Sequence, residues 1–352
     1  MPKFLIIRFS SIGDIVLTSP VVRCLKQQVK DAEVHFLTKK SFASVIEHNP
    51  FIDKKIYLER EAHPSRWLSG PPKGRAFENP LSEMIQQLRK EKYDYVIDLH
   101  NNLRTLNLKS KLGVKSFSFN KLNIEKWLLV NLKMDRMPDV HIVDRYMEAV
   151  KSLGVMNDGK GLDYFISQED GNAIQKLPEE FQKDYIAFVI GAKHNTKKLP
   201  TDKIISICKI LNRPIVLLGG KEDFDVGEKI TSAIQTAEVK SQMVFNACGK
   251  FSLNESAALI KQSSKVISHD TGLMHIAAAF KKEIISVWGN TVPEFGMYPY
   301  YGSFEVTSYK SQVANLRCRP CSKIGFDKCP KGHFRCMVEQ DEIKISEAAN
   351  RA

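Results

Sequence analysis

The chain has 352 residues, of which 43% are hydrophobic and 26% charged, and this composition is ordinary for a soluble globular protein. At roughly 150 residues per domain, its length predicts two domains, each large enough for its own core. No apolar run approaches the ~20 residues of a membrane span, so no membrane-spanning helix is expected, and the net charge of +12 points towards acidic partners such as nucleic acid, a phosphorylated glycolipid or an anionic membrane face.

The first unit of the chain reads as strand, turn and helix. Residues 4–9 form an apolar strand, residues 10–14 a polar turn, and residues 15–29 a helix that Pro20 is expected to kink. Asp14 stands at the end of the strand, where a carboxylate is either a helix cap or a general base. The turn lacks the G-x-G-x-x-G pattern, which argues against dinucleotide binding. The chain enters this strand without a signal-peptide pattern, which predicts a cytoplasmic protein.

The first half continues with the same alternation of strands and helices. Strands are expected at 33–38, 52–58, 93–99 and 115–119, with helices at 41–47, 81–90, 103–111 and 141–153. Residues 59–80 hold several prolines and glycines together with Arg60, Arg66, Lys73 and Arg75, and this predicts a mobile basic loop.

The second half restarts the alternation after a polar connection at 157–180. Strands are expected at 185–190, 214–218, 244–246, 265–269 and 283–288, with helices between them. Two successive runs of this kind predict an α/β protein with two doubly wound, Rossmann-like domains facing a central cleft. We expect an N-terminal domain at 1–165, a C-terminal domain at 175–335, and a C-terminal helix or tail at 336–352.

The most informative stretch is the strand, turn and helix at 265–280. The turn His269-Asp270-Thr271-Gly272 joins an apolar strand to a compact apolar helix, and Asp270 or Thr271 can cap that helix. The first N–H groups of the helix and its dipole favour an anion, while Gly272 allows close approach to the backbone. His275 follows one turn later, on the face of Thr271. The stretch therefore predicts a phosphate or diphosphate clamp, with an ordinary capped helix as the alternative.

Two other loops of the second half carry candidate donor-binding groups. Thr196 and Lys197 follow the strand 185–190, and a lysine there can neutralise charge on a departing diphosphate. Glu222 follows the turn Gly219-Gly220 and could accept hydrogen bonds from a ribose or a base. The segment 223–225 matches a loose D-x-D pattern, but it lies at a helix start, so no catalytic metal is expected there.

Four cysteines are crowded near the C-terminus. Cys318, Cys321, Cys329 and Cys336 begin with a C-x-x-C pair in a segment with little apolar periodicity, and His333 lies nearby. Four such thiolates can surround a tetrahedral zinc, and a reducing cytosol argues against two disulfides. The spacing departs from paired C-x-x-C knuckles, so a structural zinc and reduced thiols both remain open.

Together, these motifs resemble glycosyltransferase family 9, the ADP-heptose lipopolysaccharide heptosyltransferases. The segment 9–20 resembles the family's N-terminal signature, 98–104 resembles its Asp-Leu-Gln-x-x-x-Arg region, and 268–279 is close to its donor-site signature. The chain departs from the pattern at His100, at His194-Asn195 and at Leu199.

The resemblance implies a GT-B fold, an inverting mechanism and no cofactor or metal for catalysis. It places the general base at Asp14 and donor-site positions at Thr196, Lys197, Asp270, Thr271, Gly272 and His275. The expected reaction moves a heptose from ADP-heptose, or another nucleotide-sugar, to a lipopolysaccharide inner-core hydroxyl. Arg104, Arg60 and Arg66 would meet acidic groups of the acceptor.

Such an enzyme would lie in the cytoplasm, in peripheral contact with the inner membrane. Two alternatives come from other classes of protein. One is a nucleotide-sugar epimerase of similar architecture, which would turn over a donor without an acceptor. The other is a basic nucleic-acid-binding protein, although the chain has no recognised motif of that kind, and we expect no nucleic-acid partner.

Overall fold

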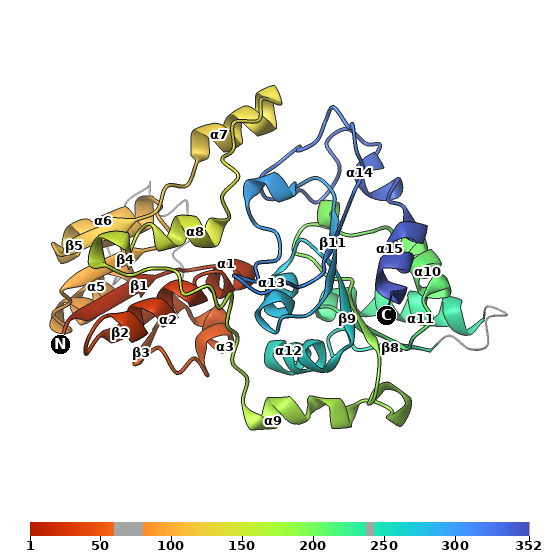
Figure 1. Ribbon diagram of the computed structural model, residues 1–352, viewed down its shortest axis with the longest axis horizontal. Helices are drawn as coiled ribbons and strands as arrows, with labels where there is room; N and C mark the ends of the chain where they lie inside the picture. Colours follow the sequence, from red (N-terminus) through yellow and green to blue (C-terminus); the bar gives the residue numbers. More distant parts are fainter. Residues whose placement is uncertain (60–79, 237–242, 352) are drawn as a thin grey trace, which may run out of the picture. The chain divides into compact units, whose positions relative to one another are not determined.

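The structure is a computed structural model that describes residues 1–59, 80–236 and 243–351 (Figure 1). The chain divides into two compact units, Met1–Lys121 with Val143–Asp158, and Leu122–Ile142 with Gly159–Ala352. Each unit contains one parallel sheet, so the predicted pair of doubly wound α/β domains is confirmed.

The first unit is built on a five-stranded sheet in the order β3-β2-β1-β4-β5, with every neighbouring pair parallel. Its strands are β1 (Lys3–Ile7), β2 (Glu33–Lys39), β3 (Lys54–Leu58), β4 (Tyr95–Asp98) and β5 (Lys115–Ser118). Residues 4–7 of the central strand are at most 1% exposed, as expected for a parallel strand that helices cover on both faces.

The helices of this unit follow the strands. They are α1 (Ile12–Val16), α2 (Ser19–Gln28), α3 (Ala43–Ile46), α5 (Pro80–Lys90), α6 (Leu103–Leu112) and α8 (Ile142–Met147). The single kinked helix predicted for residues 15–29 is wrong, because α1 ends before a new helix begins at Ser19. Pro20 lies in the first turn of α2, where its missing N–H leaves no intrahelical bond unmade. The predicted helix 141–153 is also shorter, and a 3₁₀ helix, Lys151–Leu153, follows it.

The second unit is built on a six-stranded parallel sheet in the order β11-β10-β9-β6-β7-β8. Its strands are β6 (Ile186–Val189), β7 (Ile215–Leu218), β8 (Val244–Asn246), β9 (Lys265–His269), β10 (Ile284–Trp288) and β11 (Tyr309–Gln312). Its helices include α9 (Gln168–Gly171), α10 (Thr201–Ile210), α11 (Phe224–Gln235), α12 (Leu253–Gln262), α13 (Gly272–Ala279), α14 (Arg335–Val338) and α15 (Glu342–Asn350). The helix α7 (Asn123–Trp127) and the π-helix η2 (Leu128–Leu132) also belong to this unit.

The observed division differs from the expected domain boundaries. The units part between residues 158 and 159 rather than at 165, and the segment 122–142 belongs to the second unit. Leu129 of that segment clusters with Val292 and Phe295, and the N–H of Ile142 donates to the carbonyl of Gly296 over 2.8 Å. These apolar and backbone contacts hold the segment in the second unit.

The C-terminal segment expected as a separate helix or tail is part of the second core. Met337, Ile345 and Ala349 are fully buried within the cluster that also holds Phe188 and Ile267 of the sheet. Within the part of the chain that the structure describes, no helix is long and apolar enough to cross a membrane. Apart from its end residues 59 and 80, the predicted basic loop 59–80, with Arg60 and Arg66, lies outside the described residues.

Candidate functional site

In the first unit, the turn after β1 brings Asp14 against a buried arginine. Asp14 Oδ1 lies 2.5 Å from Arg8 Nη2, and its Oδ2 accepts hydrogen bonds from the Ser11 hydroxyl at 2.7 Å and the Ser11 N–H at 3.1 Å. Arg8 also donates to the carbonyls of Ser10 and Leu99, so it joins the ends of β1 and β4. The sequence analysis did not identify Arg8 as a site residue. Its presence as a single cation in the apolar run 4–9 is the feature that could have indicated its role.

This environment fixes the charge of Asp14. Burial by itself would raise the pKa of the carboxyl, but the Arg8 charge and the hydrogen bonds from Ser11 lower it to about 2. Asp14 is therefore fully ionised at neutral pH, and its side chain is 23% exposed. The N-cap of α1 is Ser11, and Asp14 completes a capping box with it from the first turn of the helix. This structural role and a role at a reacting hydroxyl are compatible, because the carboxylate still reaches solvent.

The end of β4 supplies the other groups of this edge. Asp98 Oδ1 accepts the N–H groups of His100 and Asn101, so it fixes the turn that follows the strand. Burial, reinforced by the charges of Arg8 and Lys121, lowers the pKa of His100 to about 3, so its imidazole is neutral. His100 Nδ1 is buried without a hydrogen-bond partner among the described residues.

Arg104, predicted to bind the acceptor, lies on the first turn of α6. Its guanidinium carbon is 5.9 Å from the centre of the Phe9 ring, and the same ring packs edge-on against His100 with centroids 5.2 Å apart. Phe9 lies two residues after the end of β1, so the structure brings Arg104 and His100 to the edge that also holds Asp14. Of the predicted acceptor residues, Arg60 and Arg66 lie outside the described part of the chain.

In the second unit, the predicted residues after β6 and β9 meet. Lys197 Nζ lies 2.5 Å from Asp270 Oδ2, and the Thr291 hydroxyl donates to the same oxygen over 2.8 Å. The side chains of Lys197 and Asp270 are 16% and 13% exposed, so the pair is largely shielded from solvent but still accessible to a ligand. Strands β6, β9 and β10 are neighbours, and this explains why residues far apart in sequence share one edge.

Beside this pair lies the N-terminus of α13. The Thr271 hydroxyl caps the helix by accepting the N–H of Leu273 over 3.2 Å, so the predicted cap is confirmed at Thr271 rather than Asp270. The first-turn N–H groups of a helix have no intrahelical partner, and Gly272 adds no side chain over them. A cationic lysine and a helix N-terminus at one strand edge form a suitable cradle for a diphosphate.

A second lysine–carboxylate pair joins the loop after β6 to the turn after β7. Asp223 Oδ1 lies 2.6 Å from Lys198 Nζ, and Asp223 Oδ2 accepts the N–H of Gly220. A Cβ on Gly191 would come within 2.4 Å of Asp223 Oδ2, so glycine is required for this close approach. Glu222, which was predicted to bind the donor, is exposed in the same turn.

Two predicted donor-site residues are buried. Thr196 is 2% exposed; its hydroxyl donates to the Phe326 carbonyl and accepts the Phe326 N–H, at 3.0 and 2.8 Å. It therefore anchors the loop around Phe326, and a direct contact with the donor would require that loop to move. His275, on α13, is 2% exposed, so its side chain is packed in the interior of the unit and not presented to a ligand.

Two residues around the end of β10 escaped the sequence analysis: Asn290, which follows β10, and Arg319, which follows β11. Arg319 donates to the carbonyls of Gly289 and Thr291, at 2.6 and 3.1 Å, and so holds the strand end that carries the Thr291 hydroxyl. Asn290 is 2% exposed, and both polar atoms of its amide lack hydrogen-bond partners among the described residues. A buried polar group without a hydrogen bond lowers the stability of the fold, and a bound ligand could supply the missing partner. Asn290 is therefore a candidate for ligand contact.

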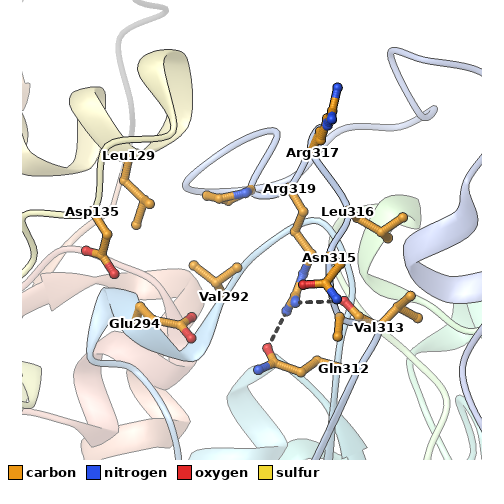
Figure 2. A pocket seen from close by; sticks show the side chains of 12 residues that line it. Leu129, Asp135, Val292, Glu294, Gln312, Val313, Asn315, Leu316, Arg317 and Arg319 are labelled. Carbon is orange, nitrogen blue, oxygen red and sulfur yellow. Dashed lines mark hydrogen bonds between the residues drawn. The ribbon is translucent and has the colours of Figure 1, made fainter.

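A cavity of about 630 Å³ has Arg319 in its lining (Figure 2). Arg319 donates within it to Gln312 Oε1 at 2.8 Å. Leu129 of η2 and Asp135, which follows η2, also line it. None of the predicted site residues lines it. Its lining mixes apolar and charged groups: Leu129, Asp135, Val292, Glu294, Gln312, Val313, Ala314, Asn315, Leu316, Arg317, Arg319 and Pro320.

The four C-terminal cysteines are reduced and close enough to influence one another. Burial, then the neighbouring Cys318 and Cys329 thiols, raise the pKa of Cys321 to about 11, and burial with all three neighbours raises that of Cys336 to about 12. Cys318 Sγ also lies 3.7 Å from His333 Nε2. Within the described residues, however, no three histidine, cysteine or acidic side chains are arranged as a metal site.

The sequence matches a family model over more than half of the chain. The model described as glycosyltransferase family 9 (heptosyltransferase) matches residues 81–324, which include Arg104, Lys197 and the Asp270 turn. The chain belongs to glycosyltransferase family 9. It is a glycosyltransferase, and this membership favours a transferase over the epimerase and the nucleic-acid-binding protein considered above.

Known proteins are similar to this chain in sequence and in fold over most of its length. Lipopolysaccharide heptosyltransferase 1 of Campylobacter coli is 24% identical over 305 residues, covering 82% of this chain and 84% of the relative. The family 9 glycosyltransferase of Veillonella parvula superposes with a TM-score of 0.74 at 22% identity, covering 99% and 96% of the two chains. The E. coli ADP-heptose lipopolysaccharide heptosyltransferase II superposes with a TM-score of 0.70 at 18% identity, covering 99% of this chain and 97% of that chain. The fold is therefore the predicted GT-B fold.

Proposed function

We propose that this family 9 enzyme transfers a heptose from ADP-heptose to a hydroxyl of a lipopolysaccharide inner core. The observation that carries the proposal is the Lys197–Asp270–Thr291 cluster beside the N-terminus of α13. Two relatives support the choice of sugar and acceptor, since one is named a lipopolysaccharide heptosyltransferase and another an ADP-heptose lipopolysaccharide heptosyltransferase.

The donor would bind through its diphosphate on the second unit. Asp270 holds the Lys197 ammonium at the strand edge, where phosphate oxygens would compete for it as the donor enters. The N–H groups of α13 at Gly272 add hydrogen bonds of the kind that anions favour. As the bond to ADP breaks, negative charge grows on the diphosphate, and these fixed groups stabilise it without a metal ion.

The acceptor would bind on the first unit. Its hydroxyl oxygen attacks the anomeric carbon of the heptose, the bond from that carbon to the ADP oxygen breaks, and the hydroxyl proton passes to the Asp14 carboxylate. Attack from the face opposite ADP inverts the anomeric configuration. Arg104, held against Phe9, is placed to meet acidic groups of the core. A lipid-linked acceptor would bring the enzyme to the cytoplasmic face of the inner membrane.

Calorimetry with ADP tests the donor site. Lys197→Ala and Thr271→Ala should each weaken ADP binding roughly tenfold or more, because a hydrogen bond to a charged group is worth about 1.5–3 kcal/mol. Lys203→Ala is the matched control, because Lys203 pairs with Glu342 on α15 instead. Unchanged ADP affinity in both site variants would show that the diphosphate does not bind at this edge of the sheet.

The chemistry has its own readout. With ADP-heptose and an inner-core acceptor, NMR of the product should show an anomeric configuration opposite to that of the donor. Turnover should persist in EDTA, because the charges on the diphosphate are met by protein groups. Retention of configuration, or loss of turnover in the chelator that Mg²⁺ restores, would contradict the mechanism.

A further inference from the structure

Asn290 lies two residues after the end of β10, at the sheet edge that carries Lys197 and Asp270. The residue is 2% exposed, and neither its Nδ2 nor its Oδ1 has a hydrogen-bond partner among the described residues. Most buried polar side chains in folded proteins are hydrogen-bonded, because an unmade bond costs the desolvation of the group. This amide therefore calls for a partner from outside the described chain.

The main chain around Asn290 is held at three consecutive carbonyls. Arg319 donates to the carbonyls of Gly289 and Thr291, the residues on either side, at 2.6 and 3.1 Å. The carbonyl of Asn290 itself accepts the N–H of Cys321 over 3.2 Å. The amide is therefore carried by a fixed piece of backbone, as a preorganised binding group is.

The neighbours of Asn290 contact both sides of the Lys197–Asp270 pair. A Cβ on Gly289 would come within 2.9 Å of the main-chain carbonyl that precedes Lys197. On the other side, the Thr291 hydroxyl donates to Asp270 Oδ2 over 2.8 Å. Because consecutive Cα atoms are only about 3.8 Å apart, Asn290 lies beside the pair that is proposed to meet the diphosphate.

The chemistry of an amide argues against the diphosphate as its partner. Phosphate oxygens accept hydrogen bonds, so they would satisfy Nδ2 of Asn290 but would repel Oδ1, which is also an acceptor. A sugar hydroxyl both donates and accepts, so one hydroxyl or two adjacent ones satisfy both atoms of the amide.

The strand order indicates which sugar of the donor this is. Glu222, the predicted contact for the ribose or the base, follows β7, whereas Asn290 follows β10, and β6 and β9 lie between these strands. At about 4.8 Å per strand, β7 and β10 are about 14 Å apart along the sheet edge. Lys197 and Asp270 follow the two strands between them, so a diphosphate there leaves the nucleoside on the β7 side and the transferred sugar on the β10 side.

We propose that Asn290 recognises the transferred sugar by exchanging hydrogen bonds with one or two of its hydroxyl groups. This inference rests on the proposed function, because it takes the diphosphate to lie at Lys197 and Asp270. As the phosphates take Lys197 from Asp270, the Thr291 contact to the same carboxylate loosens and the strand end opens to the sugar. A sugar that lacks the hydroxyl leaves the buried amide unsatisfied, so Asn290 contributes to the choice of sugar.

Calorimetry of the full chain with ADP and with ADP-heptose, in the absence of acceptor, tests the proposal. Asn290→Leu keeps the size of the side chain and removes both polar atoms. This variant should bind ADP within twofold of wild type and ADP-heptose roughly tenfold more weakly, because the hydrogen bonds to the sugar are lost. Among monodeoxy analogues of ADP-heptose, one should bind wild type roughly tenfold more weakly than ADP-heptose, whereas Asn290→Leu should bind the two alike.

Thermal unfolding separates a ligand contact from a structural role. Asn254→Leu is the matched control, because Asn254 is also buried but accepts the Tyr164 hydroxyl over 2.6 Å. This control should lower the Tm and bind both ligands like wild type, since it leaves the Tyr164 hydroxyl unpaired. Asn290→Leu should have a Tm at or above that of wild type, because it removes an amide that has no partner in the fold.

Three results would overturn the inference. They are wild-type affinity of Asn290→Leu for ADP-heptose, an equal loss of ADP and ADP-heptose affinity in this variant, and a fall in its Tm as large as that of Asn254→Leu. Lys197→Ala separates this inference from the proposed function. Unchanged ADP affinity in Lys197→Ala contradicts the proposed donor site, whereas a loss there with unchanged ADP-heptose binding by Asn290→Leu contradicts this inference alone.

Discussion

The carboxylate of Asp14 serves both in the capping box of α1, with Ser11, and as the partner of the buried Arg8 guanidinium. A strong ion pair keeps it ionised but makes it a weak base, whereas general-base catalysis is most efficient when the pKa lies near the working pH. The two demands are reconciled if proton transfer comes late, when the forming bond to the sugar has made the attacking hydroxyl acidic. Catalysis then depends on the position of Asp14 more than on its intrinsic basicity.

Asp14→Asn should lower the transfer rate ~100- to 10,000-fold and leave ADP affinity nearly unchanged, because losing a general base costs a factor of this size. Initial rates and ADP calorimetry measure the two effects. Asp158→Asn is the control, since Asp158 forms a comparable ion pair with Arg23 in the same unit, at 2.7 Å. Transfer by Asp14→Asn within threefold of Asp158→Asn would remove Asp14 from the mechanism.

The same residue predicts a pH dependence of stability. The folded pKa of Asp14, about 2, lies below its ordinary value of 3.8, so its ionised form stabilises the fold by about 2 kcal/mol above pH 4. That contribution declines as the pH falls from about 4 to about 2. Urea unfolding should show wild type more stable than Asp14→Asn at pH 7, with a smaller gap at pH 3. An equal gap at both pH values would contradict the low pKa.

At the scale of elements, the site depends on which loops follow neighbouring strands. β6, β9 and β10 adjoin in the sheet, so their following loops deliver Lys197, Asp270 and Thr291 to one place. The cysteine-containing loop is tied to this edge twice, by Arg319 at the end of β10 and by Thr196 through Phe326. The loop has little regular structure of its own, so these ties hold it, together with its apolar ends, where Leu316 and Cys336 meet the core of the second unit.

A structural zinc in this loop stays a prediction. Burial and the neighbouring cysteines raise the pKa of Cys321 and of Cys336, and a bound zinc ion would offset this by stabilising their thiolates. Elemental analysis of protein purified without added metal should give about one zinc per chain, lost in Cys321→Ser and kept in Cys24→Ser. Metal-free protein with four freely titrating thiols and unchanged thermal stability would end the idea.

At the scale of the whole molecule, the chain passes from the first unit to the second at residue 121, returns at 143, and leaves again after 158. The returning segment supplies Val143, Tyr146 and Val150, all at most 1% exposed, to the core of the first unit. The intervening excursion, 122–142, carries α7 and η2. A simple cut between two halves of the chain would therefore remove part of the first core.

The sequence alone determined the two doubly wound sheets, because buried parallel strands and amphipathic helices each leave a periodic pattern that local chemistry imposes. It also located the strand-end turns that hold Asp14, Arg104, Lys197 and Asp270, since polar residues directly after an apolar run mark the edge where ligands bind. Only the tertiary structure decided which of these groups meet. Arg8, Thr291 and Arg319 gain their roles from neighbouring strands or loops, and Thr196 is taken up by a loop 130 residues away. Hydrogen bonds and ion pairs of this kind depend on the distance between residues in space, and a local sequence pattern does not specify which distant residues come together.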